Sequence, residues 1–127
     1  MAFNVTELKV ATSDGQNVRL LESFTYTRND GCVITVPEGV TSDGASTPPV
    51  IWAEVPPFGK YWLAAILHDY MYRNISIPKD FADETFLEAM LSLNVNETMA
   101  KAVYEGVRLF GKKAFYEDRE DQYKLQF

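Results

Sequence analysis

The single histidine of the chain, His68, and the carboxylate of Asp83 are the side chains whose types and spacing best suit acid–base chemistry. His68 lies in an apolar segment with helical spacing, and Asp83 shares the apolar stripe of the next helical segment with Phe86 and Met90. Because an unpaired buried carboxylate is costly, we expect Asp83 to hydrogen-bond to His68 across two antiparallel helices. The pair is either catalytic, with one ring nitrogen left to act as a base, or merely a fastener between two helices.

Residues close to the histidine are candidates for supporting roles. Tyr72 lies one helical turn further on and can donate its hydroxyl to Asp83, and a plain core tyrosine is the alternative. Asp69 points about 100° away around the helix, so it serves a different partner from the histidine. With backbone oxygens and Asp43, which lies in a Ser-Asp-Gly segment, Asp69 could bind a calcium ion; an ordinary turn and a solvated Asp69 are the alternative.

Composition limits the classes of protein and partner. The 127 residues are 46% hydrophobic and 24% charged, which is ordinary for one globular domain. Lys and Arg number 12 against 18 Asp and Glu, a net charge of −6 that argues against nucleic acid as a partner. The single cysteine, Cys32, excludes an intramolecular disulfide and a multi-cysteine zinc site, and it fits assembly in a reducing cytoplasm.

No segment has the composition of a membrane span or an export signal. The longest mostly apolar run, Tyr61 to Leu67, is far below the length of about 18 residues that a transmembrane helix needs. The N-terminus has no basic region followed by an apolar stretch, so we expect no secretion by a signal peptide.

The first part of the chain, residues 1–40, is predicted to be β-rich. It is rich in Val, Thr, Tyr and Phe, and Asp30-Gly31 supplies the residues of a tight hairpin turn. We therefore expect an N-terminal antiparallel sheet of short strands over residues 3–10, 18–27 and 32–36.

The remainder is predicted to be a loop followed by helices. Residues 41–60 are rich in Pro and Gly and contain several apolar side chains, which favours a long ordered loop. Residues 61–115 show helical spacing, with Asn96 as the N-cap of the last helix, and residues 116–127 form a charged tail with aromatics. The three helices are expected over residues 61–72, 80–93 and 96–115. Together these stretches predict a single α+β domain over residues 1–127.

The motifs carry two resemblances to known families. The helical core of bacterial phospholipases A2 is resembled by His68-Asp69-x-x-Tyr72, Asp83-x-x-Phe86 and Tyr104-x-x-Val107-Arg108-x-Phe110-Gly111, and their upstream calcium segment by Asp43-Gly44-Ala45-Ser46. Over nearly the whole chain, the order of motifs also resembles a family of small phage and prophage proteins of unknown function. The additional motifs are Val36-Pro37-x-Gly39, Thr41-x-Asp43-Gly44-Ala45-Ser46-x-Pro48 and Gly59-x-Tyr61.

The phospholipase resemblance implies a mechanism and a three-helix core of that type. It implies that His68 takes a proton from water, that Asp83 orients His68, that Tyr72 supports the pair, and that Asp69 and Asp43 bind calcium. A cation beside an ester carbonyl stabilises the oxyanion as it forms. The first hypothesis is therefore a phage-encoded, calcium-assisted ester hydrolase that acts on lipid.

The phage resemblance implies a second hypothesis, a non-catalytic virion structural or assembly protein of a tail or baseplate. In that case the His68–Asp83 pair survives as a helix fastener, and the C-terminal tail docks on a neighbouring subunit. Both hypotheses imply synthesis in the host cytoplasm, and the second places the protein in the virion. The expected partners are a lipid substrate under the first hypothesis, and phage structural proteins or a second copy of the chain under the second.

Overall fold

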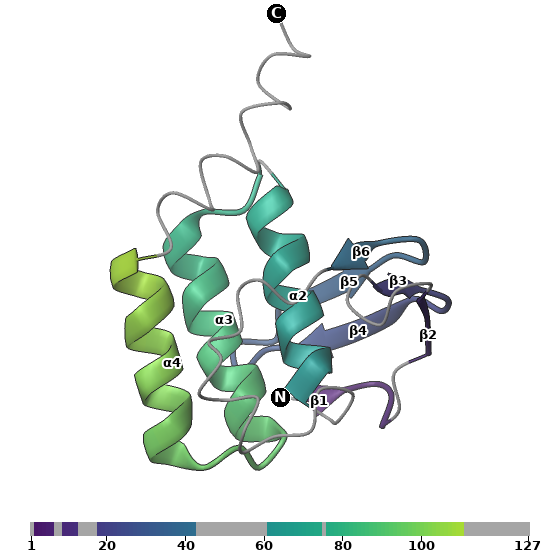
Figure 1. Cartoon of the computed structure of the whole chain (residues 1–127). Coiled ribbons are helices and arrows are strands. Elements are labelled where there is room, and N and C mark those ends of the chain that lie inside the picture. Colours follow the sequence, from purple (N-terminus) through teal and green to yellow (C-terminus); the bar gives the residue numbers. More distant parts are fainter. Residues whose placement is uncertain (1, 7–8, 13–17, 43–60, 75, 111–127) are drawn as a thin grey trace, which may run out of the picture.

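The computed structural model describes residues 2–6, 9–12, 18–42, 61–74 and 76–110. Within these ranges, helices and two small antiparallel sheets form an α+β fold, which confirms the predicted class. Figure 1 shows the helices side by side, with α2 (Tyr61–Arg73) next to the strands, α3 (Lys79–Ser92) beyond it and α4 (Glu97–Phe110) outermost. Residues 43–60 of the loop predicted over 41–60, the end of the last predicted helix after residue 110 and the predicted tail over 116–127 lie outside the described residues.

Helix α2 is the central element of the fold. It is apolar around its whole circumference and lies between α3 and the strands, so 11 of its 13 residues are buried. A helix with apolar residues on every side is stable only when neighbours cover every side. The polar groups of α2 that share this burial, His68 and Asp69, therefore need hydrogen-bond partners inside the protein.

Helices α3 and α4 begin close to where the sequence predicts. The carbonyl of Pro78 accepts the first helical bond of α3 from the amide of Ala82, at 3.1 Å. Asn94 then adopts a left-handed φ of 63°, which asparagine tolerates and which ends the helical path. The Asn96 side chain accepts a bond from the Met99 amide at 3.2 Å, so it caps α4 as predicted.

The hairpin of β4 (Phe24–Thr27) and β5 (Val33–Val36) forms as its turn residues predict. Gly31 takes a φ of 87°, and the Arg28 amide closes the turn by donating to the Cys32 carbonyl at 2.8 Å. The buried residues alternate along each strand and face each other across the pair, Phe24 opposite Val36 and Tyr26 opposite Ile34.

The prediction of one N-terminal sheet with a strand over 3–10 and another over 18–27 is wrong. Besides β4 and β5, the described strands are β1 (Ala2–Phe3), β2 (Val10–Thr12), β3 (Val18–Leu20) and β6 (Thr41–Ser42). They form two sheets, in the orders β1-β4-β5 and β2-β3-β6. Each long predicted strand is replaced by two short strands, one for each sheet, and the exposed residues 21–23 separate the two strands that replace 18–27.

The strand β6 falls in a segment predicted to be loop. It consists of two residues and pairs with β3, with Ser42 opposite Val18. A bridge this short leaves no periodic pattern in the sequence. Its position matters because it lies against α2, where Arg73 donates a hydrogen bond to the Thr41 carbonyl.

A carboxylate on α3 ties the hairpin to the helices. Glu88 accepts bonds from the Tyr26 hydroxyl at 2.9 Å and from the Asn29 amide at 2.7 Å. Burial and the neighbouring Glu88 carboxylate raise the pKa of Tyr26 well above its usual value, so the phenol stays protonated and keeps donating. The sheet of β1, β4 and β5 is thereby fixed on α3.

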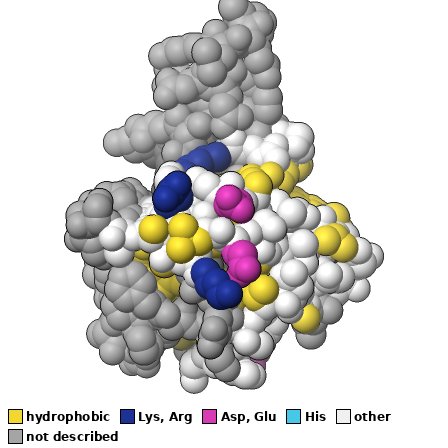
Figure 2. All heavy atoms as spheres, turned by 90° about the vertical axis from the view of Figure 1, so that its right-hand side faces the viewer, with side chains coloured by type: hydrophobic (Ala, Val, Ile, Leu, Met, Phe, Trp, Pro, Cys, Tyr) yellow, Lys and Arg dark blue, Asp and Glu magenta, His cyan; other side chains and the backbone are white. Residues whose placement is uncertain are grey.

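The outer surface of the strand side is mixed in character. Figure 2 shows acidic and basic side chains next to each other there, with small apolar areas beside them. Among the described residues, none of the helices is long and apolar enough to cross a membrane.

The burial of α3 predicts a sharp contrast between two adjacent residues. Met90 has no exposed surface, whereas Leu91 is 40% exposed. We expect Met90→Ala to lower the free energy of unfolding by about 2–5 kcal/mol, because a large buried side chain leaves a cavity, and Leu91→Ala to lower it by less than about 1 kcal/mol. Urea denaturation of both variants measures this. Equal losses would contradict the described packing of α3.

Candidate functional site

The described structure brings His68 and Asp83 into direct contact inside the protein. Nε2 of His68 lies 2.8 Å from Oδ1 of Asp83, across the interface of α2 and α3. The exposed fractions are 0% for His68 and 1% for Asp83. The spacing of the apolar stripes predicts this contact, and the contact is present; the catalytic role assigned to it stays a prediction.

Two further donors reach the Asp83 carboxylate. The Tyr72 hydroxyl donates to Oδ1 at 2.5 Å, from one turn after His68 on α2. The ammonium of Lys79 donates to Oδ2 at 2.6 Å, from one turn before Asp83 on α3. Three side chains therefore satisfy one carboxylate, which is the condition for a charge to remain in a buried place.

These hydrogen bonds determine the charge of Asp83. Burial by itself would raise the pKa of the Asp83 carboxyl, but the hydrogen bonds from His68, Lys79 and Tyr72 outweigh burial and hold the pKa below its ordinary value. At neutral pH the carboxylate is ionised and can only accept hydrogen bonds. The proton shared with His68 therefore belongs to Nε2 of the imidazole.

The surroundings of the ring leave its second nitrogen apart from this network. The imidazole of His68 stacks on Phe86 of α3, with ring centroids 4.3 Å apart, and contacts the ring of Tyr72 at 4.1 Å. Nδ1 is buried and has no hydrogen-bond partner among the described residues. With the proton on Nε2, Nδ1 carries the lone pair of the neutral ring.

Asp69 faces a different neighbour from His68. Its Oδ2 accepts a hydrogen bond from the hydroxyl of Ser42 on β6, and Asp69 is 6% exposed. The one-residue offset on α2 thus directs His68 towards α3 and Asp69 towards the strands, as the helical geometry predicts.

The predicted calcium ligands are only partly within the described structure. Asp43 lies outside the described residues, and Asp69 is the one predicted carboxylate ligand inside them. Within the described ranges, no group of three or more His, Cys, Asp and Glu side chains is placed to hold a metal ion. Calcium binding therefore stays a prediction.

Two residues that contact the predicted site are absent from the prediction. Lys79 donates a hydrogen bond to Asp83, and Ser42 donates one to Asp69. Lys79 had a signal in the sequence, because Lys and Asp four residues apart lie on the same face of a helix. Ser42 had none, because its contact with Asp69 depends on a two-residue strand and a partner 27 residues away.

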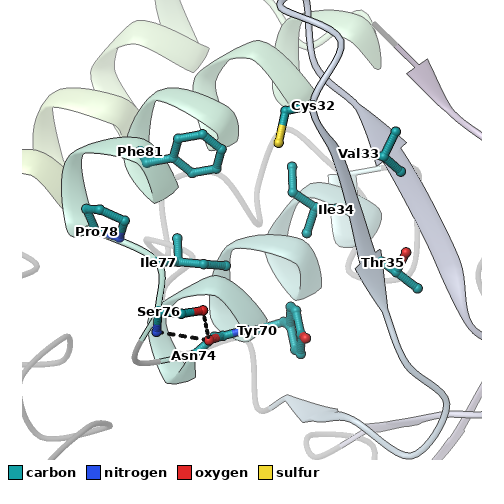
Figure 3. Close-up of a pocket in the computed structure, with 10 residues that line it drawn as sticks. All are labelled: Cys32, Val33, Ile34, Thr35, Tyr70, Asn74, Ser76, Ile77, Pro78 and Phe81. Carbon is teal, nitrogen blue, oxygen red and sulfur yellow. Dashed lines mark hydrogen bonds between the residues drawn. The ribbon is translucent and has the colours of Figure 1, made fainter.

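A pocket with room for about 350 Å³ lies elsewhere on the molecule, between β5 and the connection from α2 to α3. Figure 3 shows Ile34, Ile77 and Phe81 turned towards it, with Tyr70 of α2 and Asn74, which follows α2, at its edge. Position 70 lies on the side of α2 away from His68 and Tyr72. The pocket is therefore separate from the His68–Asp83 pair.

Comparison with known proteins gives a family and no function. The sequence model of a family described as "Protein of unknown function (DUF1353)" matches residues 18–107. No curated protein and no solved structure shows a significant match to the chain. The matched range includes both helices that carry the His68–Asp83 pair.

The lowered pKa of Asp83 predicts how the pair contributes to stability as pH changes. Because the folded protein holds that pKa below the ordinary value of 3.8, the contribution is complete above this value and is lost as pH falls through the folded value. Near neutral pH, we expect Asp83→Asn to lower the free energy of unfolding by about 3–5 kcal/mol, because Lys79 is left without its counter-charge. In acid, the difference in the free energy of unfolding between Asp83→Asn and the parent should become smaller.

Asp80→Asn is the matched control, since Asp80 is an exposed acid in the first turn of the same helix. Its effect should stay below about 1 kcal/mol. Denaturation at a series of pH values measures both variants. A constant difference between Asp83→Asn and the parent through the acid range would contradict the ionised, hydrogen-bonded carboxylate.

Proposed function

The chain belongs to the family described as "Protein of unknown function (DUF1353)", and from its site we propose that it is a hydrolase whose general base is His68 and whose orienting acid is Asp83. One observation carries the proposal. The imidazole places Nε2 on a buried carboxylate at 2.8 Å and leaves Nδ1, also buried, without a partner among the described residues. A ring fixed in this way has one defined nitrogen, Nδ1, that can accept a proton.

The proposed reaction uses that nitrogen as base and then as acid. Nδ1 of His68 takes a proton from water, and the hydroxide so formed attacks the carbonyl carbon of an ester. The tetrahedral intermediate collapses, the C–O bond to the alcohol breaks, and the alcohol oxygen takes the proton back from Nδ1. Asp83 stabilises the imidazolium formed between these steps, and Tyr72 and Lys79 keep Asp83 ionised.

The proposed substrate is a lipid ester. The support is the resemblance of His68-Asp69-x-x-Tyr72 and Asp83-x-x-Phe86 to bacterial phospholipases A2, whose motifs here lie on α2 and α3. The same resemblance makes calcium the proposed cofactor and Asp69 its proposed ligand, with Asp43 from outside the described residues. The described residues provide one of these carboxylates, that of Asp69.

The second candidate function is a phage virion structural or assembly protein, synthesised in the host cytoplasm, in which the same network has no catalytic role. The burial of His68, with an exposed fraction of 0%, favours this candidate. A base without exposed surface reaches water only after neighbouring segments move. In this reading, the hydrogen bonds of Asp83 simply fasten α2 to α3, and the partners are other phage proteins or a second copy.

Hydrolysis of phospholipid in mixed micelles separates the two candidates. With calcium present, we expect the parent protein to release fatty acid and His68→Ala to do so at least about 100-fold more slowly, because the general base is lost. Lys101→Met is the control, since Lys101 is an exposed residue of α4 with no part in the proposed reaction. This variant should retain the parent rate. A parent protein that releases no fatty acid, or an equally active His68→Ala, would rule out the hydrolase.

Calcium dependence tests the proposed cofactor separately. We expect isothermal titration calorimetry to detect calcium binding to the parent, and Asp69→Asn to abolish it while keeping the fold, because the amide oxygen still accepts the bond from Ser42. Asp80→Asn should bind calcium like the parent. If the parent binds no calcium, or hydrolyses lipid equally fast with a chelator, the calcium site is wrong.

A further inference from the structure

Lys79 makes more polar contacts in this region than its place at the start of α3 suggests. Its Nζ donates to Oδ2 of Asp83 at 2.6 Å, to the Val107 carbonyl at 3.0 Å and to the Arg108 carbonyl at 3.2 Å. An ammonium group has three protons, so these three acceptors use all of them. The side chain is only 13% exposed, and its Nζ also lies 5.9 Å from the centre of the Tyr72 ring.

The two oxygens of Asp83 divide their partners unequally. Oδ1 accepts hydrogen bonds from both His68 and Tyr72, whereas Oδ2 accepts one from Lys79. The carboxylate can rotate about its bond to Cβ, and contacts on one oxygen alone leave that rotation weakly restrained. A charged donor held on Oδ2 fixes the plane of the carboxylate, and with it the direction in which Oδ1 meets Nε2 of His68.

The position of that donor is set by a third helix. Val107 and Arg108 lie in the last turn of α4, where backbone carbonyls run out of amide donors within the helix and where the helix dipole favours a cation. The same end of α4 is anchored to the core by the buried side chains of Val103 and Val107. Lys79 therefore joins a fixed helix end to the carboxylate that holds the histidine.

We propose that Lys79 is a positioning residue, which uses the C-terminal carbonyls of α4 to hold the Asp83 carboxylate in the orientation that receives the Nε2 proton of His68. Its place in catalysis rests on the proposed hydrolase. Its effect on His68 does not, because the geometry of the hydrogen bond exists whether or not the protein turns over a substrate. The two can therefore be tested apart.

Because His68 is the only histidine, the proton on its Nε2 gives a single imidazole N–H signal in a proton NMR spectrum of labelled protein. The experiment compares the parent with Lys79→Met, which keeps the apolar stem and removes the donors, and Lys79→Arg, which keeps a charged donor. Lys101→Met is the matched control, since Lys101 pairs with an acid four residues away on α4 but is 61% exposed. All spectra are taken at one neutral pH.

We expect the N–H signal to be sharp in the parent and in Lys101→Met, lost or broadened in Lys79→Met, and restored in Lys79→Arg. If Lys79→Met does not fold, Lys79→Gln takes its place, because its uncharged amide keeps only part of the contacts. A Lys79→Met or Lys79→Gln spectrum that retains the parent signal overturns the proposal.

The kinetic readout uses the lipid assay. Lys79→Met should lower kcat by about 10- to 100-fold with KM unchanged within about twofold, because a misplaced base slows the chemical step without touching the substrate. A raised KM with unchanged kcat overturns the positioning role. An inactive parent whose N–H signal still responds to Lys79→Met removes the hydrolase and leaves the positioning of His68 intact.

Discussion

The structure depends on keeping one carboxylate charged in the interior. Asp83 has an exposed fraction of 1%, and a charge in such a place survives only when donors replace the water it has lost. His68, Tyr72 and Lys79 supply those donors from two helices. Each is placed by the regular geometry of its helix, since Tyr72 lies four residues after His68 and Lys79 four residues before Asp83. The pairing of α2 with α3 and the chemistry of the site therefore have the same cause.

That network extends the site over the whole helical layer. Through the Val107 and Arg108 carbonyls, Lys79 adds the end of α4 to the contact between α2 and α3. On its other side α2 meets the strands, where Ser42 binds Asp69 and Thr41 binds Arg73. Adjacent residues of α2 thus face separate polar clusters, one among helices and one at a sheet.

The sequence predicts the helices and the His68–Asp83 contact because both follow from short-range periodicity and from the cost of burying a lone carboxylate. Asn96 as a cap follows from the same local physics. The division of the strands between two sheets could not be predicted, because composition indicates an extended backbone but does not say which neighbour each short strand pairs with. The contact of Ser42 with Asp69 was missed for the same reason, whereas Lys79 could have been found from its spacing to Asp83.

The most direct test of the account is the nitrogen NMR spectrum of the parent protein with its single histidine labelled at both ring nitrogens. The account predicts one slowly exchanging tautomer at neutral pH. Nε2 is protonated, since an ionised Asp83 can only accept, and Nδ1 is not, since a proton on this buried nitrogen would have no acceptor among the described residues. A spectrum with the proton on Nδ1, or with the average of two rapidly exchanging tautomers typical of a solvated imidazole, would contradict the pairing on which the fold and the proposed chemistry both rest.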